Sequence, residues 1–294
     1  MTTKNLLVEL FVEELPPKAL KKLGESFGRE IRQGLIDLLL VIPEANWTWF
    51  ATPRRLAVHI CDVEPKQRER VVTEKILPVS VALDLHGNPT PALLKKLAAK
   101  NIDVTHVPFF GRQMDGKTEV LVRQWTDTGF HLSQVMGDVL ERAFAKLPIP
   151  KVMTYQLTDG WTDVKFVRPA HGLVILHGAD ILEGVRTSDN QLVLGLEPSR
   201  ETRGHRFEAV VDPLVLDNAD VYVEVLKRDG AVIASFAERK AEIARQLAAA
   251  ASKVGGGVTA IEDDALLDEV TALVERPNVL ICEFEKEYLD VPQE

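Results

Sequence analysis

The sequence predicts an α+β fold in which mixed sheets pack against helices. Apolar runs of strand length occur in both halves of the chain, for example at residues 6–12 and 172–176. Elsewhere apolar residues recur every three or four positions, as at residues 132–147, which is the period of an amphipathic helix. Because strands and helices do not alternate in a strict βαβ rhythm, the pattern favours α+β over a parallel α/β sheet.

The first half of the chain is expected to carry helices between strands. Residues 6–12 predict a buried strand, and the prolines at 16 and 17 suit the first turn of the helix that follows. The apolar stripe of this helix consists of Leu20, Leu23, Phe27, Ile31, Leu35 and Leu38. Further strands are expected at 47–50, 56–63 and 118–124, and further helices at 91–100 and 132–147.

The proline-containing segment 147–150 ends the last of these helices and is the best boundary between a region 1–150 and a region 151–294. Beyond it, the sequence predicts short strands followed by helices. The strands are expected at 164–167, 172–176, 181–185 and 192–196, with a last one at 278–284. The helices are expected at 218–227, 235–251 and 259–274, the third opened by the capping-box pattern of Thr259 and Glu262.

The composition is that of a soluble globular protein with an acidic balance. The 294 residues have a formal net charge of -9 and a pI of about 5.4. This charge argues against indiscriminate coating of nucleic acid but leaves room for a local basic patch. No apolar run approaches the ~18 residues of a membrane span, and the N-terminus lacks signal-peptide features. Cys61 and Cys282 lie in apolar runs and are expected to be buried free thiols of a reducing cytoplasm.

Sequence patterns for a catalytic, cofactor or metal site are weak. The glycine-rich residues 253–258 follow a helix and lack the Gly-Lys-Ser/Thr ending of a phosphate-binding loop. His171 and His177, if they share a strand, lie roughly 20 Å apart, too far to bind one ion. The acidic residues 262–264 suit a helix start, and neither cysteine has basic neighbours that would activate it. We therefore predict no catalytic, cofactor-binding or metal-ligating residue in this chain.

Basic residues gather in three short groups of this acidic chain. The groups are Arg54 with Arg55, then Arg168 with His171, and finally Arg200, Arg203, His205 and Arg206. The planar fork of arginine suits phosphate, and Gly204 allows a close backbone approach. Salt bridges to the 44 acidic residues are the alternative. Spacing alone leaves both readings open.

Six segments in a fixed order resemble the N-terminal part of the β subunit of the bacterial heterotetrameric glycyl-tRNA synthetase. They lie at residues 7–20, 49–57, 146–151, 166–171, 203–207 and 269–275, and the resemblance spans nearly the whole chain. More distantly, the region is similar to the B3/B4 modules of the phenylalanyl-tRNA synthetase β subunit, which edit mischarged tRNA. The family's β subunit continues into an HD-type helical domain and an anticodon-binding domain, so we expect a truncated chain.

The resemblance implies a part in glycine–tRNA ligation without catalysis by this region itself. In this family the α subunit carries the catalytic core that uses ATP, with Mg²⁺, and glycine, and two α and two β subunits form a cytoplasmic heterotetramer. The β subunit is then expected to bind tRNA(Gly) and to assemble with α, without a cofactor, a membrane or DNA. An editing hydrolase of the B3/B4 type and a structural scaffold without RNA contact are the alternatives.

The basic groups are the expected contacts with tRNA or with the α subunit. The candidate residues are Arg54, Arg55, Arg168, His171, Arg203, His205 and Arg206. We expect the arginines to form a single outward-facing surface that attracts anions, with the two histidines as hydrogen-bonding supports. Glu13 and Glu14 are expected to fix the corner between the first strand and the first helix.

Overall fold

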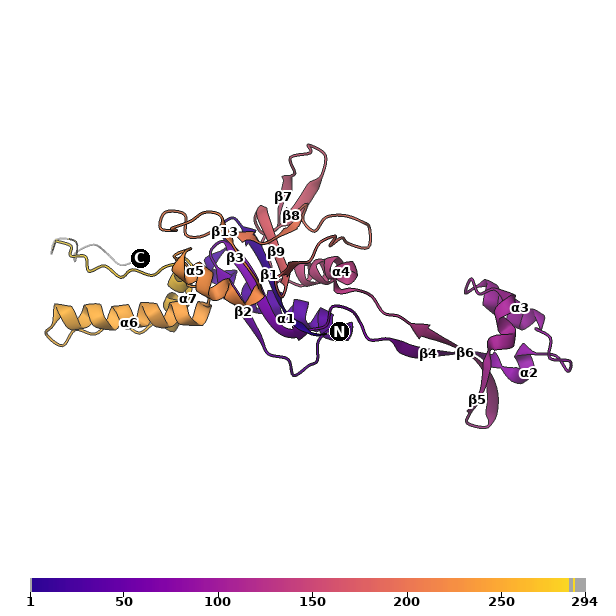
Figure 1. Cartoon of the computed structure of the whole chain (residues 1–294). Coiled ribbons are helices and arrows are strands. Elements are labelled where there is room, and N and C mark those ends of the chain that lie inside the picture. Colours follow the sequence, from indigo (N-terminus) through magenta and orange to yellow (C-terminus); the bar gives the residue numbers. More distant parts are fainter. Residues whose placement is uncertain (1, 286–287, 289–294) are drawn as a thin grey trace. The chain divides into compact units, whose positions relative to one another are not determined.

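The computed structural model describes residues 2–285 and 288 and divides the chain into two compact units. The first unit comprises Met1–Pro65 and His131–Glu294, and the second comprises Lys66–Phe130. Helices are mixed with sheets that are mainly antiparallel (Figure 1), so the predicted α+β class is confirmed. The division expected near residue 150 falls inside the first unit and stays a prediction.

A six-stranded sheet forms the centre of the first unit. Its strands run in the order β10–β9–β1–β3–β2, and β11 pairs with β9. Their bounds are β1 Lys4–Val12, β2 Trp47–Thr52, β3 Arg55–Val63, β9 Ala170–His177, β10 Asp180–Ile181 and β11 Pro198–Ser199. The middle strand β1 places Val8 opposite Val58 on one side and Ile175 on the other. Both faces of β1 are covered, which explains its unbroken apolar sequence.

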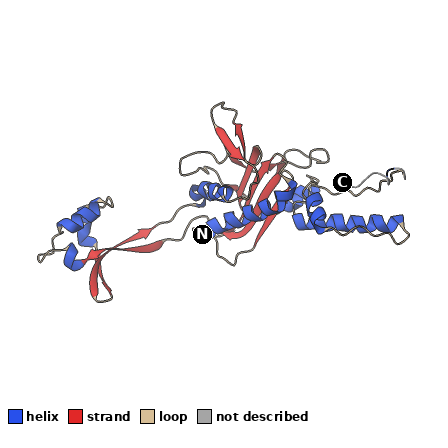
Figure 2. Cartoon of the chain, turned by 180° about the vertical axis from the view of Figure 1, so that it is seen from behind, coloured by secondary structure: helices blue, strands red, loops and turns tan. Residues whose placement is uncertain are grey.

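One face of this sheet packs against two helices, α1 (Pro17–Asp37) and α4 (Leu132–Ala145). Figure 2 shows a helix lying across the strands of this sheet. The apolar stripe predicted for α1 is the buried one, since Leu20, Phe27 and Leu35 have no exposed surface. Gly24 lets this helix approach β2 closely, because an added Cβ would lie 2.6 Å from the Cβ of Ala51.

The other face of the sheet packs against a short 3-10 helix, η2 (Ala219–Val221), and α5 (Tyr222–Arg228). Tyr222 and Leu226 pack there against Leu7 and Leu176. The remaining elements of the first unit are two small two-stranded pairings and two helices. They are β7 Met153–Gln156 with β8 Asp163–Phe166, β12 Glu201–Thr202 with β13 Leu214–Val215, α6 Phe236–Val254 and α7 Asp264–Thr271.

The second unit has its own sheet and its own small core. Strands β4 (Arg70–Pro78), β5 (Gly111–Asp115) and β6 (Thr118–Asp127) pair in the order β4–β6–β5. Helices α2 (Val79–Ala82), α3 (Pro91–Ala98) and the 3-10 helix η1 (Val104–Phe109) complete it. The core residues are Ile76, Ala82, Leu93, Leu97, Ile102, Val107 and Leu121. The charged residues 70–78 form β4 by pairing antiparallel with β6.

Several predicted elements of the second half are wrong. The run 181–185 pairs only at Asp180–Ile181, and 192–196 forms an isolated bridge between Val193 and Leu196. Residues 278–284 form no strand. Apart from the short pairing of Asp180–Ile181 with β9, these runs lack a partner strand, and without one an apolar sequence does not become part of a sheet.

The start of α7 and the state of one cysteine also differ from expectation. The helix begins at Asp264, and the side chain of Asp263 caps it by accepting from the backbone N–H of Leu266. The capping box predicted at Thr259 is therefore wrong, because an aspartate nearer the helix supplies the cap. Cys61 is half-buried in β3, whereas Cys282 is exposed, so the expected burial is wrong for Cys282.

None of the helices in the described part of the chain is both long enough and apolar enough to cross a bilayer.

Gly137 offers a test of the packing of α4. A Cβ at this position would lie 2.0 Å from the carbonyl oxygen of Arg186 and 2.8 Å from the backbone nitrogen of Thr187. Because those atoms belong to the main chain, Gly137→Ala should lower the free energy of unfolding by about 1–3 kcal/mol. Glu141→Ala, at an exposed position of the same helix, should stay within about 0.5 kcal/mol. Urea unfolding followed by circular dichroism measures both, and equal values would contradict this packing.

Candidate functional site

The first basic group lies in the tight turn between β2 and β3. Thr52 pairs with Arg55 across this turn, so Pro53 and Arg54 form its tip. Arg54 is 8% exposed and Arg55 is fully buried, on the α5 side of the sheet. The expectation that these two arginines face outward is therefore wrong.

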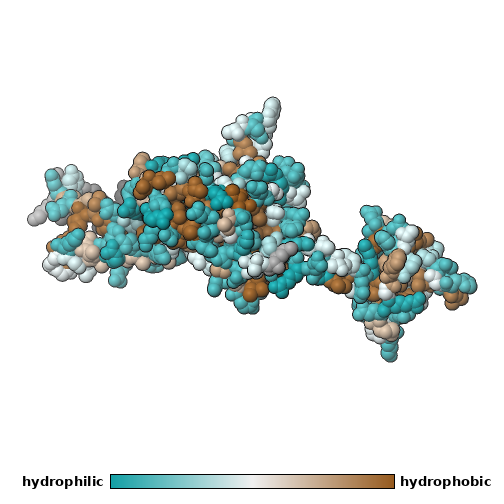
Figure 3. Space-filling model, viewed as in Figure 1, coloured by the Kyte–Doolittle hydropathy of each residue, from teal (hydrophilic) through white to brown (hydrophobic). Residues whose placement is uncertain are grey.

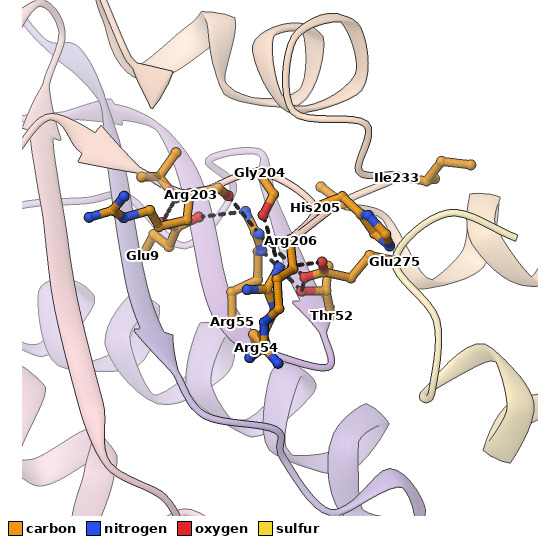
Figure 4. Close-up of polar contacts among 12 residues, drawn as sticks. Glu9, Thr52, Arg54, Arg55, Arg203, Gly204, His205, Arg206, Ile233 and Glu275 are labelled. Atoms are coloured by element: carbon orange, nitrogen blue, oxygen red, sulfur yellow. Dashed lines mark hydrogen bonds and ion pairs between the residues drawn. The ribbon is translucent and has the colours of Figure 1, made fainter. Parts of the chain in front are cut away.

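Glu275 and Glu9 neutralise the two buried guanidinium groups (Figure 4). Arg54 Nη2 lies 2.7 Å from Glu275 Oε2, and Arg55 Nη2 lies 3.4 Å from Glu275 Oε1. Arg55 Nη1 is 3.5 Å from Oε2 of Glu9, whose side chain has no exposed surface. Two guanidinium groups thus face two carboxylates, and the cluster holds no net charge that would call for an outside anion.

Hydroxyl groups complete this cluster. Thr52 donates to Glu275 Oε1 across 3.2 Å and accepts from Arg55 Nε across 3.0 Å. The hydroxyls of Thr202 and Tyr222 both donate to Glu9. We call the set of Glu9, Thr52, Arg54, Arg55, Thr202, Tyr222 and Glu275 the buried arginine cluster.

Burial and ion pairing act in opposite directions on the ionisable groups of the buried arginine cluster. Burial alone would raise the pKa of Glu275, but Arg55 and Arg54 outweigh it, so that pKa lies below its ordinary value. Burial would lower the pKa of Arg55, yet Glu9 and Glu275 hold it above its ordinary value. Burial, together with the charge of Glu9, raises the pKa of Tyr222 well above its ordinary value. Glu275 and Arg55 therefore stay charged at neutral pH, and the Tyr222 hydroxyl keeps its proton.

The two arginines also hold the backbone of the third basic group. Arg55 Nη2 donates to the carbonyl oxygen of Arg203, and Arg54 Nη2 donates to that of Gly204, each across 2.8 Å. Gly204 is required at this point, because an added Cβ would lie 2.8 Å from the Cα of Gly230. The first and third basic groups therefore do meet in space, through main-chain carbonyls.

The side chains of the third group lie at the surface. Arg203 and Arg206 are exposed, and His205 is half-buried. Arg203 Nη1 pairs with Asp212 at 2.9 Å, and Arg206 Nη2 pairs with Glu14 at 3.2 Å. These two guanidinium groups are thus outward-facing, as expected, but each already has a carboxylate beside it.

The second basic group reaches the same corner, where β1 ends and α1 begins. Arg168 Nε donates to the backbone oxygen of Glu14 across 2.9 Å, and His171 Nε2 lies 2.8 Å from Glu13 Oε1. Because Arg206 also pairs with Glu14, the corner joins the second and third groups. The expectation that Glu13 and Glu14 fix this corner agrees with these contacts. Whether the basic residues touch tRNA or a partner stays a prediction.

Arg239 is a further buried arginine that sequence reasoning missed. It lies on α6, has no exposed surface, and donates to the carbonyl oxygens of Ala51 (2.7 Å), Thr271 (3.1 Å) and Ile233 (2.7 Å). Burial lowers its pKa to about 10. The carbonyls come from β2, α7 and the segment before α6, so one side chain ties the last helices to the sheet. A lone arginine on a helix gives no sequence signal for this role.

The pH dependence of stability tests the pairing of Glu275. Its pKa is lower in the folded than in the unfolded chain, so its charge stabilises the fold above the ordinary carboxyl pKa of about 4.3. This stabilisation is lost as the pH falls through the lower folded value. Glu275→Gln should therefore cost about 3 kcal/mol at pH 7, because it leaves two buried cations with one carboxylate. The variant should also lose less of its remaining stability between about pH 5 and pH 3.

Urea unfolding at several pH values measures both effects of Glu275→Gln. Glu183→Gln changes an exposed glutamate and should match the wild type at every pH. A Glu275→Gln protein with wild-type stability at pH 7 would contradict the role given to this carboxylate.

Comparison with known proteins assigns the chain to a family. The family model described as "Glycyl-tRNA synthetase beta subunit" matches residues 6–294. The chain is 59% identical over 294 residues to the glycine–tRNA ligase beta subunit of Acidovorax ebreus (strain TPSY), and 59% identical over 303 residues to that of Polaromonas naphthalenivorans (strain CJ2). It is 56% identical over 302 residues to that of Dechloromonas aromatica (strain RCB).

All of this chain aligns with each of these three relatives, and it covers 40%, 42% and 41% of their respective lengths. The chain therefore spans about two fifths of the curated relatives that it matches. Because the family model covers nearly every residue, the chain belongs to the glycyl-tRNA synthetase beta subunit family.

Proposed function

We propose that this chain serves glycine–tRNA ligase, an aminoacyl-tRNA synthetase, by binding tRNA(Gly) and by assembling with a catalytic α subunit. The complete enzyme joins glycine to tRNA(Gly) with ATP and releases AMP and diphosphate. In the proposal the α subunit carries out the chemistry on ATP, with Mg²⁺, and two α and two β subunits form a cytoplasmic heterotetramer. Membership of the beta subunit family supports this division of labour, because a subunit named beta implies a companion subunit.

One observation carries the proposed contact with tRNA. Arg168 and Arg206 both contact Glu14 at the corner between β1 and α1, and Arg203 lies three positions before Arg206 in the same loop, where it pairs with Asp212. A guanidinium group has five N–H donors, whereas Arg203 uses Nη1 for Asp212 and Arg206 uses Nη2 for Glu14. Donors are therefore left over for phosphate oxygens, which arginine binds bidentately.

The buried arginine cluster gives this surface a fixed geometry. Arg54 and Arg55 bind the carbonyl oxygens of Gly204 and Arg203, so the main chain under the surface arginines is held from inside the protein. A surface held in place before binding loses less conformational freedom on binding. In the proposal Arg54 and Arg55 thus act by positioning, and Arg168, Arg203 and Arg206, with His171 and His205, touch the ligand.

A double substitution tests this function. Arg203→Ala with Arg206→Ala should weaken the binding of labelled tRNA(Gly), and the slope of log affinity against log salt should shrink by roughly two, since two phosphate contacts are lost. The matched control is Arg29→Ala with Arg245→Ala, which removes two other exposed arginines, each beside a carboxylate. Fluorescence anisotropy at several salt concentrations, with and without the α subunit, measures both variants.

The control variant should bind tRNA(Gly) as the wild type does. Unchanged affinity and slope for the Arg203/Arg206 variant would remove these residues from the RNA contact. Weaker association with the α subunit at unchanged tRNA affinity would likewise contradict a contact with RNA and place a partner protein there.

A further inference from the structure

The loop that carries the third basic group has a main chain fixed at many points. His205 N donates to Gly230 O across 2.6 Å, and Val210 N donates to Asp229 O across 2.8 Å. Between them, Ala209 N donates to His205 O across 3.2 Å and closes a single turn. With the carbonyls of Arg203 and Gly204 held by the buried arginine cluster, the path of the loop is set at both of its ends.

Three charged side chains of this loop each have an ion-pair partner. Arg203 pairs with Asp212, Arg206 with Glu14, and Glu208 with Arg276, the last at 2.9 Å. Because these contacts hold the main chain of the loop in place, an exposed side chain on it cannot turn into the core.

Phe207 is an exposed aromatic side chain of this loop. The residue is 87% exposed, although burying a phenylalanine side chain removes a large apolar surface from water and stabilises the fold. His205 touches the ring from its edge, with centroids 6.2 Å apart and ring planes at 66°, so most of the ring surface stays open. Apolar side chains reach the visible surface of the first unit in several places (Figure 3), but Phe207 stands between two charged residues, Arg206 and Glu208.

A flat open ring next to arginine donors fits one nucleotide of a single-stranded or unstacked RNA segment. Aromatic side chains bind such segments by stacking on a base, while cationic groups bind the neighbouring phosphates. The flanking charges argue against a continuous apolar contact with a protein, which would bury a broader patch of this surface. Val210 and Val211, 78% and 54% exposed, are the residues that a protein partner would use instead.

We propose that Phe207 is a stacking platform for an unpaired base of the bound tRNA. This inference rests on the proposed tRNA-binding function and adds to it: the arginines hold phosphates, and the ring holds a base. Base stacking on an aromatic residue is worth about 1–3 kcal/mol, or roughly a 5- to 150-fold change in affinity. Stacking displaces no counterions, so it should leave the salt dependence unchanged.

The test measures tRNA(Gly) affinity for Phe207→Ala and Phe207→Trp, with this chain and with its complex with the α subunit. Phe207→Ala should bind about 5- to 150-fold more weakly, with the salt slope of the wild type. Phe207→Trp keeps an aromatic face and should restore most of the affinity. Trp161→Ala removes another exposed aromatic ring, 89% exposed in the turn between β7 and β8, and should change nothing.

Each other outcome overturns the inference in a distinct way. If the wild type binds tRNA(Gly) and Phe207→Ala binds equally well, the stacking platform is wrong while the proposed function stands. If Phe207→Ala weakens association with the α subunit and leaves tRNA affinity unchanged, the ring anchors a protein. If the wild type binds no tRNA(Gly) in either form, the proposed function fails and the inference fails with it. Thermal unfolding of each variant confirms that the exposed substitutions leave the fold intact.

Discussion

The pairing of Arg55 with two buried carboxylates is the interaction on which the first unit depends. Arg55 belongs to β3, Glu9 to the middle strand β1, and Glu275 to the segment after α7. One guanidinium group therefore ties together parts of the chain that lie far apart in sequence. Breaking a buried ion pair by removing one partner leaves an uncompensated charge in the interior, which costs far more than the loss of a surface pair. Any arrangement that separates Arg55 from Glu9 or Glu275 is therefore disfavoured.

The buried guanidinium groups have different partners at the two sites: carboxylates in the buried arginine cluster and backbone carbonyl oxygens around Arg239. In the buried arginine cluster, two cations face two carboxylates. Arg239 has backbone carbonyl oxygens as its hydrogen-bond partners, and burial accordingly lowers its pKa. Carbonyl dipoles offset part of the desolvation of a guanidinium group but do not cancel its charge. Both sites lie between the sheet and the C-terminal segments, so the docking of α6 and α7 onto β2 combines these polar contacts with the apolar packing of Phe236 against Trp49.

The sequence predicted the fold class and the main elements because these follow from local apolar patterns. The stripe of α1 and the unbroken apolar run of β1 are read directly from spacing. The partners of Arg54 and Arg55 could not be predicted, since Glu275 lies 220 or more positions away along the chain and nothing local marks it. The three basic groups, which the sequence predicts to form one outward-facing surface, do meet, but through main-chain carbonyls and Glu14, and Arg54 and Arg55 are buried. Their division into buried and exposed members depends on which distant segments pack over the turn between β2 and β3, and this is a tertiary property.

The recognition of the loop through its main chain has a consequence for how this surface can vary. Arg54 and Arg55 hydrogen-bond the carbonyl oxygens of Gly204 and Arg203, and every amino acid has such an oxygen. The course of the loop and the chemistry that it displays are consequently specified by separate sets of residues. Substitutions at 203 or 206 would change which ligand the loop binds, while the path of its main chain stays the same. Mutation there could therefore change specificity without changing the fold. Gly204 is the exception, because there the trajectory itself depends on the residue.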